Sequence, residues 1–329
     1  MPSYQPIPPG AAVHREFTRL YRLAQQQRPG AGDAWNGELY AVDGGAWGQL
    51  NRESGAIALS SQHVLPHLSG QTRPEHAHDQ AAALRQVLKV ATRAGMPSPA
   101  AASPHAGGLA VGIVEVRAAT DFETFAEQAG YVNLPAPPPE AEGAFTATDS
   151  LLTQASGLTA GRDALLSELV ATPVGEQFDR LANGVVRNRL REEIPYDAAR
   201  QQAARARLVE PMMHEAWPAL PRHRAAAGRQ VGEEIRTGLN SAVEALRHEH
   251  RHPGGPSAPP PAGPDRSTEP ESGRSAEAPA AAPNDQLRFL TGQPSPVGAV
   301  SSKPSLGDGA RGRGGSPGEP RERTPERGL

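Results

Sequence analysis

The sequence contains no cysteine among its 329 residues. Neither a disulfide framework nor a thiolate metal site is therefore available to this chain. It also has no run of about 18 apolar residues, which excludes a conventional transmembrane helix. Residues 1–10 lack both the basic and the apolar segments of a secretory signal. We therefore expect a cytoplasmic protein with no membrane partner.

Signals of several other functional classes are also missing. There is no Gly-x-Ser-x-Gly elbow, and the Asp-Gly-Gly turn at 43–45 is not followed by the Lys-Ser/Thr of a phosphate loop. The formal net charge is only −3, so the chain lacks the strongly basic character of a nucleic-acid surface. We expect neither a nucleic-acid partner nor a cofactor.

The composition changes near residue 250. From 251 to 329 there are 15 Pro and 13 Gly in 79 residues, with few large apolar side chains. Such a segment cannot bury enough surface to offset the entropy lost on ordering. We therefore expect a folded domain over 1–250 and a disordered Pro/Gly/Ala-rich tail over 251–329. The apolar island at 285–290 fits a partner-binding segment and a cluster without function equally well.

Hydrophobic periodicity predicts a mostly α fold with a small N-terminal β-meander, an α+β arrangement. Strands are expected over 38–42, 46–50 and 55–60, with a hairpin turn at 43–45. Asp79 is the expected N-cap of one helix, and 120–123 resembles a capping box that opens a short one. Residues 135–139 predict a stiff linker. The longer helices are expected over 12–27, 79–95, 107–119, 149–156, 162–171, 174–192, 197–216 and 228–250.

The helix over 79–95 follows the predicted strands, where one class of metalloenzymes carries His-Glu-x-x-His. In that motif two imidazoles at i and i+4 share one helix face, a glutamate acts as general base, and a later helix adds the third ligand. The zinc ion polarises the substrate carbonyl and lowers the pKa of its bound water. A β-meander before such a helix is the usual architecture of zincins.

Three segments carry a resemblance to a known family. They are residues 55–65 (Gly-Ala-Ile-Ala-Leu-Ser-Ser-Gln-His-Val-Leu), 83–96 (Ala-Leu-Arg-Gln-Val-Leu-Lys-Val-Ala-Thr-Arg-Ala-Gly-Met) and 111–119 (Val-Gly-Ile-Val-Glu-Val-Arg-Ala-Ala), followed by Phe122. They resemble uncharacterised zincin-like proteins of streptomycetes, with weaker likeness over 149–246. In that family the middle segment reads Val-Leu-His-Glu-x-x-His-Ala-Gly-Met. The use of 31 Arg against two Lys is similarly typical of high-GC actinobacterial proteins.

The resemblance places Lys89 and Arg93 at the two histidine positions, Val90 at the general-base position and Glu115 at the third-ligand position. An ammonium and a guanidinium do not ligate Zn²⁺ at neutral pH, and valine accepts no proton. The resemblance therefore implies a pseudoenzyme, a metallopeptidase-like chain with a degenerate metal site. We expect Glu115 to pair with Lys89 or Arg93, so that an ion pair replaces the metal bridge. The alternative interpretation of Lys89 and Arg93 is an ordinary solvated helix face.

The leading hypothesis is a non-catalytic zincin-like protein that acts as a binding or interaction module for a protein or peptide partner. One alternative is an active metallohydrolase with atypical ligands such as His76, His78 and Glu115. His248 and His252, at i and i+4 near the end of the last helix, are a second weak metal candidate. The other alternative is an unrelated helical structural protein.

A structural observation separates the leading hypothesis from the structural alternative. In a zincin-like fold we expect the helices over 79–95 and 107–119 to lie side by side. We also expect both to lie beneath an edge strand formed by 55–60.

Overall fold

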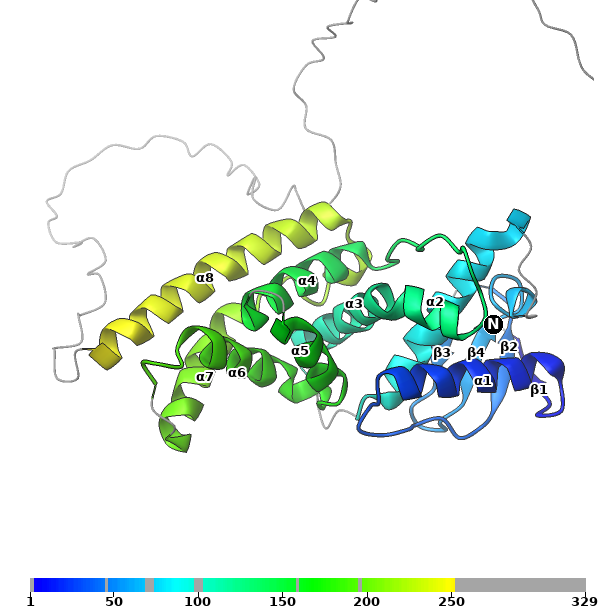
Figure 1. The fold of residues 1–329 in the computed structure, drawn as a ribbon, viewed down its shortest axis with the longest axis horizontal. Coiled ribbons are helices and arrows are strands. Elements are labelled where there is room, and N and C mark those ends of the chain that lie inside the picture. The colour runs from blue at the N-terminus through cyan, green and yellow to red at the C-terminus, as the bar shows by residue number, and fades with distance from the viewer. Residues whose placement is uncertain are drawn as a thin grey trace, which may run out of the picture. The chain divides into compact units, whose positions relative to one another are not determined.

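The computed structural model describes residues 3–44, 47–68, 74–97, 103–157, 160–194 and 197–251. The chain separates into two units, 1–283 and 284–329, and every described residue belongs to the first. The tail expected over 251–329 lies outside the described residues except for Arg251, which ends the last helix. Within the described ranges the fold is mostly helical with a small sheet near the N-terminus, as predicted, and this sheet has four strands (Figure 1).

The sheet differs from the expected meander. Its strands are β1 (Tyr4–Ile7), β2 (Leu39–Val42), β3 (Gly48–Leu50) and β4 (Ile57–Ser60). Their order in the sheet is β1-β2-β4-β3, in which β2 and β4 run parallel and the two outer strands are antiparallel to their neighbours. The hairpin predicted between the strands at 38–42 and 46–50 is wrong because β4, whose four residues are all buried, lies between β2 and β3. The short edge strand β1 was not predicted.

Two helices pack with this sheet around one hydrophobic core. The first, α1 (Ala12–Gln27), has the predicted bounds and buries Phe17, Leu20 and Ala24. The second, α2 (Ala77–Gly95), packs against α1 and against the edge strand β3. Asp79 is not its N-cap, because the helix already begins at Ala77 and Asp79 lies in its first turn. There the negative charge of its carboxylate still interacts favourably with the positive end of the helix dipole.

The next helix, α3 (Pro104–Gln128), is longer than expected. Ser103 caps it by accepting a hydrogen bond from the Ala106 amide, and Pro104 occupies the first turn, where no backbone donor is needed. The capping box predicted over 120–123 is wrong, because the helix continues through it. Asp121 accepts hydrogen bonds from two arginines instead of capping a new helix.

Five further helices and the first half of α3 enclose a second hydrophobic core. The first of them, α4 (Glu142–Ser156), lies very close to α3 at Gly112, where an added Cβ would lie 1.9 Å from Thr148 Oγ1 and 2.6 Å from the Ala144 carbonyl oxygen. Glycine is needed there because the two helix backbones are nearly in contact. The other four are α5 (Ala160–Val170), α6 (Gln177–Arg189), α7 (Ala198–Met212) and α8 (Ala225–Arg251).

The two cores share α3. Leu109 and Ile113 in its first half belong to the core of the helical bundle, whereas Phe122 and Phe125 in its second half belong to the core beneath the sheet. The helices α2 and α3 lie side by side, as expected. The expectation that 55–60 forms the edge strand is wrong, since β4 is internal and β3 is the edge next to α2.

No helix in the described ranges combines the length and the apolar character that crossing a lipid bilayer requires.

Candidate functional site

The positions that the resemblance singles out lie on a helix with little exposed surface. Fourteen of the 19 residues of α2 are buried, because α1, α3 and β3 all pack around it. Lys89 is only 2% exposed, so its interpretation as part of a solvated face is wrong. Arg93 is half-buried, and its guanidinium donates to the Gly48 carbonyl on β3 at 3.4 Å. A buried ammonium requires a partner, because leaving it unpaired would cost several kcal/mol.

Glu115 on α3 is that partner. Its Oε1 lies 2.6 Å from Lys89 Nζ, and its Oε2 accepts a hydrogen bond from Arg85 Nη2 at 2.8 Å. The two cations are one helical turn apart on α2, so both face the same carboxylate. The ion pair expected between Glu115 and Lys89 is therefore present, and Arg85 joins it. Arg93 acts on this carboxylate only through its longer-range charge.

A second carboxylate closes the cluster from the loop that follows α3. Glu140 Oε2 lies 2.7 Å from Lys89 Nζ, and Gln86 donates its side-chain amide to the other oxygen. Arg85 Nη1 also donates to the Pro137 carbonyl at 2.8 Å, which holds this loop against α2. The Glu140 side chain is 48% exposed, so the cluster meets solvent there. Two carboxylates thus balance the charges of Lys89 and Arg85.

The electrostatics of Glu115 result from two opposing effects. Burial alone would raise the pKa of its carboxyl, because a low-dielectric surrounding disfavours the charged form. Lys89 and Arg85 outweigh that effect through their charges and hydrogen bonds, so the pKa of Glu115 lies below its ordinary value. Burial also lowers the pKa of Arg93, but a guanidinium stays protonated throughout the range in which proteins are folded. The Glu115 carboxyl is therefore charged at neutral pH.

The lowered pKa of Glu115 predicts a pH-dependent stability. A carboxyl whose folded pKa is depressed contributes stability that is present above its unfolded pKa of about 4.3 and is lost as the pH falls through the folded pKa. We expect the free energy of unfolding, measured in urea, to fall as the pH drops from about 5 towards 3. The Glu115→Gln variant should have a flatter pH profile over that interval. A variant profile parallel to that of the parent protein would show that Glu115 makes no such contribution.

The position that the resemblance would assign to a general base carries a side chain that has no proton chemistry. Val90 is fully buried and faces the edge strand β3, where a Cβ added to Gly48 would lie 3.0 Å from Val90 Cγ1. Lys89 Nζ contacts the carboxylates of Glu115 and Glu140, so it is not free to act as a nucleophile. The residues at these positions thus provide neither a zinc ligand nor a base.

The alternative ligand set is not brought together. His76 and His78 are exposed at the start of α2, whereas Glu115 is 1% exposed and engaged by two cations. Over the described ranges, no three His, Cys, Asp or Glu side chains are grouped so that they could hold a metal ion. The pair formed by His248 and His252 is not testable, because His252 lies outside the described residues.

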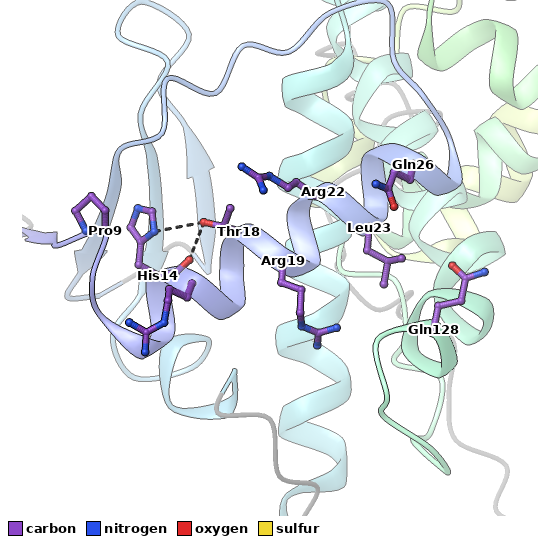
Figure 2. Close-up of a pocket in the computed structure, with 9 residues that line it drawn as sticks. Pro9, His14, Thr18, Arg19, Arg22, Leu23, Gln26 and Gln128 are labelled. Atoms are coloured by element: carbon purple, nitrogen blue, oxygen red, sulfur yellow. Dashed lines mark hydrogen bonds between the residues drawn. The ribbon is translucent and has the colours of Figure 1, made fainter.

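Three surface cavities of about 490–620 Å³ lie elsewhere on the molecule. One, of about 620 Å³, is a groove along the outer face of α1, and Figure 2 shows the side chains of α1 that line it. The other two lie between α5 and α6 and over the strands β2, β3 and β4. None of the three is lined by Lys89 or Glu115. The charge cluster is thus separate from these accessible surfaces.

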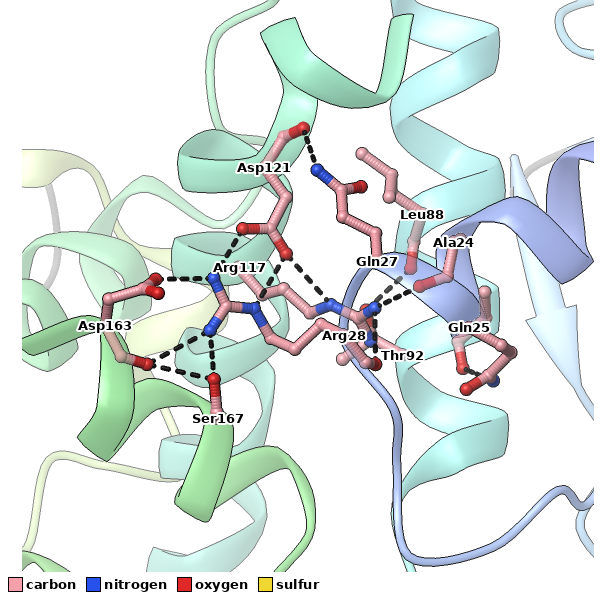
Figure 3. Close-up of polar contacts among 11 residues, drawn as sticks. Ala24, Gln25, Gln27, Arg28, Leu88, Thr92, Arg117, Asp121, Asp163 and Ser167 are labelled. Carbon is pink, nitrogen blue, oxygen red and sulfur yellow. Dashed lines mark hydrogen bonds and ion pairs between the residues drawn. The ribbon is translucent and has the colours of Figure 1, made fainter. Parts of the chain in front are cut away.

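A second buried charge cluster joins α1, α3 and α5 (Figure 3). Arg28, at the end of α1, donates to both oxygens of Asp121, at 2.8 and 2.7 Å, and also pairs with Asp163 at 2.6 Å. Arg117 contacts the same Asp121 oxygen as the Arg28 Nε, at 3.3 Å, and donates to the carbonyls of Ala24 and Arg28. Asp121 is 4% exposed and Arg117 is fully buried. These groups lie between the two hydrophobic cores, and their contacts are internal to the fold.

Sequence reasoning identified Lys89 and Glu115 but missed Arg85, Gln86 and Glu140. One signal was available for Arg85, since residues 85, 89 and 93 recur every four residues and place three cations along one row of the helix. Glu140 gave no signal, because its contact depends on the path of the loop over α2. The second cluster was also missed, because Asp121 was assigned to a helix cap.

Comparison with known proteins adds no assignment: the chain matches no protein-family model, no curated protein and no solved structure. The class that the described fold and site define is a mainly helical protein with a small sheet and a buried, charge-balanced cluster between α2 and α3.

Proposed function

We propose that this chain is a non-catalytic, zincin-like protein that acts as a binding module for a protein or peptide. The observation that carries the proposal is the Lys89–Glu115 ion pair at 2.6 Å, buried between α2 and α3 at the positions where the family would hold zinc. The Lys89 ammonium and the Arg85 guanidinium together balance the two carboxylates without a dication. In this proposal the ion pair is what remains of a lost metal site.

Two further observations support a module without catalysis. Val90 at the general-base position is fully buried against β3, so no base faces a substrate there. The Pro137–Glu140 loop is held over the cluster by Arg85 and Lys89, which restricts access to it. A site whose charges balance, whose access is restricted and which lacks a base favours a structural use of these residues. Function then resides on another surface of the fold.

Zinc content tests this proposal. The protein purified without a histidine tag is expected to contain far less than one zinc per chain by atomic emission or mass spectrometry, because Lys89 and Arg93 cannot ligate the ion. The triple variant Lys89→His, Val90→Glu, Arg93→His should bind about one zinc per chain with Glu115 as the third ligand.

The matched control adds Glu115→Gln to the triple variant and is expected to lose the zinc. A version that also carries Arg85→Gln removes the cation that competes for Glu115, and it should bind zinc more tightly than the triple variant. Stoichiometric zinc in the parent protein would refute the loss of the site. Failure of both restored variants to bind zinc, although circular dichroism shows them folded, would favour the unrelated helical protein.

A further inference from the structure

The groove along α1 is the most cationic of the three cavities. Its lining includes Arg15, Arg19 and Arg22, which recur at i, i+4 and i+7 and therefore share one face of the helix. Pro9 and Gln128 line it from outside α1 (Figure 2). No carboxylate belongs to this lining.

The charges of the three arginines are not equally compensated. Arg19 pairs with Glu16 at 2.6 Å and donates to the Ala129 carbonyl at 2.9 Å. The hydrogen bond from Arg19 holds the pKa of Glu16 below its ordinary value. Arg15 donates only to the Gly10 carbonyl, and within the described ranges neither Arg15 nor Arg22 forms an ion pair. Both side chains are exposed, so the groove presents two uncompensated positive charges.

We propose that this groove binds an extended acidic peptide with carboxylates at alternate residues. Along the helix axis, Arg15 and Arg22 are about 10 Å apart, with Arg19 between them. Alternate residues of an extended chain are about 6.6 Å apart and point to the same side. Two or three such carboxylates therefore lie within reach of the flexible guanidiniums, and planar guanidiniums suit carboxylates because their paired donors match the two oxygens.

The polar side chains in the lining fit the same ligand. Gln26 and Gln128 lie at the end of the groove nearest the C-terminus of α1, and both are exposed. Each amide has a donor and an acceptor for the backbone of an extended peptide. This assignment rests on the proposed function, since it names a surface and a partner class for the binding module.

Fluorescence anisotropy with a labelled (Glu-Ala)₄ peptide tests the proposal on the full-length chain. We expect saturable binding that weakens as the salt concentration rises, because exposed charges are screened. The neutral (Gln-Ala)₄ peptide should not bind. The double variant Arg15→Gln, Arg22→Gln should bind the acidic peptide about tenfold more weakly. Its thermal midpoint should match that of the parent, since both side chains are exposed.

The matched control is the double variant Arg224→Gln, Arg229→Gln. It removes two exposed arginines, of which Arg224 directly precedes α8 and Arg229 lies near its start. This variant should bind the peptide as well as the parent does. Absence of saturable binding, equal binding of the neutral peptide, or equal loss in both double variants would overturn the proposal. A labelled single-stranded oligonucleotide that binds more tightly and displaces the peptide would also overturn it, in favour of a nucleic-acid surface. Zinc content is measured independently, so this proposal can fail while the lost metal site stands.

Discussion

Replacing Glu115 by alanine is expected to lower the free energy of unfolding by about 3–5 kcal/mol. The carboxylate is 1% exposed and is the only acidic partner of Arg85 in the described part of the chain. Its removal leaves the buried Arg85 guanidinium without a carboxylate, and the buried Lys89 ammonium keeps only one of its two carboxylate partners, Glu140, among the described residues. The cost arises mainly from these stranded cations, because an intact buried pair contributes little net stability. Equilibrium unfolding in urea, followed by circular dichroism, measures the change.

Two variants separate this explanation from a simple loss of packing. Glu140→Ala removes a carboxylate that is 48% exposed, so its effect should be about 1 kcal/mol or less. The variant Arg85→Met, Lys89→Met, Glu115→Leu replaces the buried ions with apolar side chains of similar size. It should regain most of the stability lost in Glu115→Ala, since it strands no charge. A triple variant as unstable as Glu115→Ala would contradict the explanation.

The second large effect is expected at the cluster between the two cores. Replacing Asp121 by alanine should also cost about 3–5 kcal/mol, because two arginines lose the carboxylate that they share. Arg28 retains Asp163, but the Asp163 side chain is 70% exposed and compensates a buried charge less well. Among the described residues, Arg117 then keeps only the backbone carbonyls of Ala24 and Arg28 as partners. Thermal and urea unfolding of the variant measure the loss.

Hydrogen exchange adds a local measurement for the same variant. Arg117 donates to the carbonyls of Ala24 and Arg28, so its displacement should increase amide exchange at the end of α1. Asp163→Ala is the matched control on the exposed side of the same cluster, with an expected cost of about 1 kcal/mol or less. Equal costs for the two substitutions would show that burial of Asp121 does not determine its contribution.

Local patterns predicted the helices better than the sheet. The apolar spacing of α1 gave its bounds, because one face of that helix packs and the other is exposed. The order of the strands was not predictable from turn signals, since it depends on which strand is buried on both faces. β4 holds that central position, and the Gly-containing β3 lies at the edge. The continuity of α3 past residue 120 was missed because Asp121 serves a distant ion pair.

The candidate site was predictable only in part. The ion pair between Glu115 and Lys89 was predicted, because the resemblance assigns both residues to ligand positions of one metal site. The burial of Lys89 was not predictable in this way. A helical wheel shows on which face of a helix a charged residue lies, but it does not show how many other elements pack around that helix. Arg85 is buried for the same reason. Contacts that depend on loops, such as those of Glu140 and Pro137, require the tertiary structure.

The sharing of α3 between the two hydrophobic cores has a consequence for how the fold is lost. If the core beneath the sheet opened alone, Phe122 and Phe125 would be exposed on a helix whose other half is still anchored by Leu109 and Ile113. Opening the other core would expose the opposite half in the same way. Opening either core alone therefore costs more free energy than it would if α3 were not anchored in the other core. The helix thus couples the two parts into one cooperative melting unit, although each has a hydrophobic interior of its own.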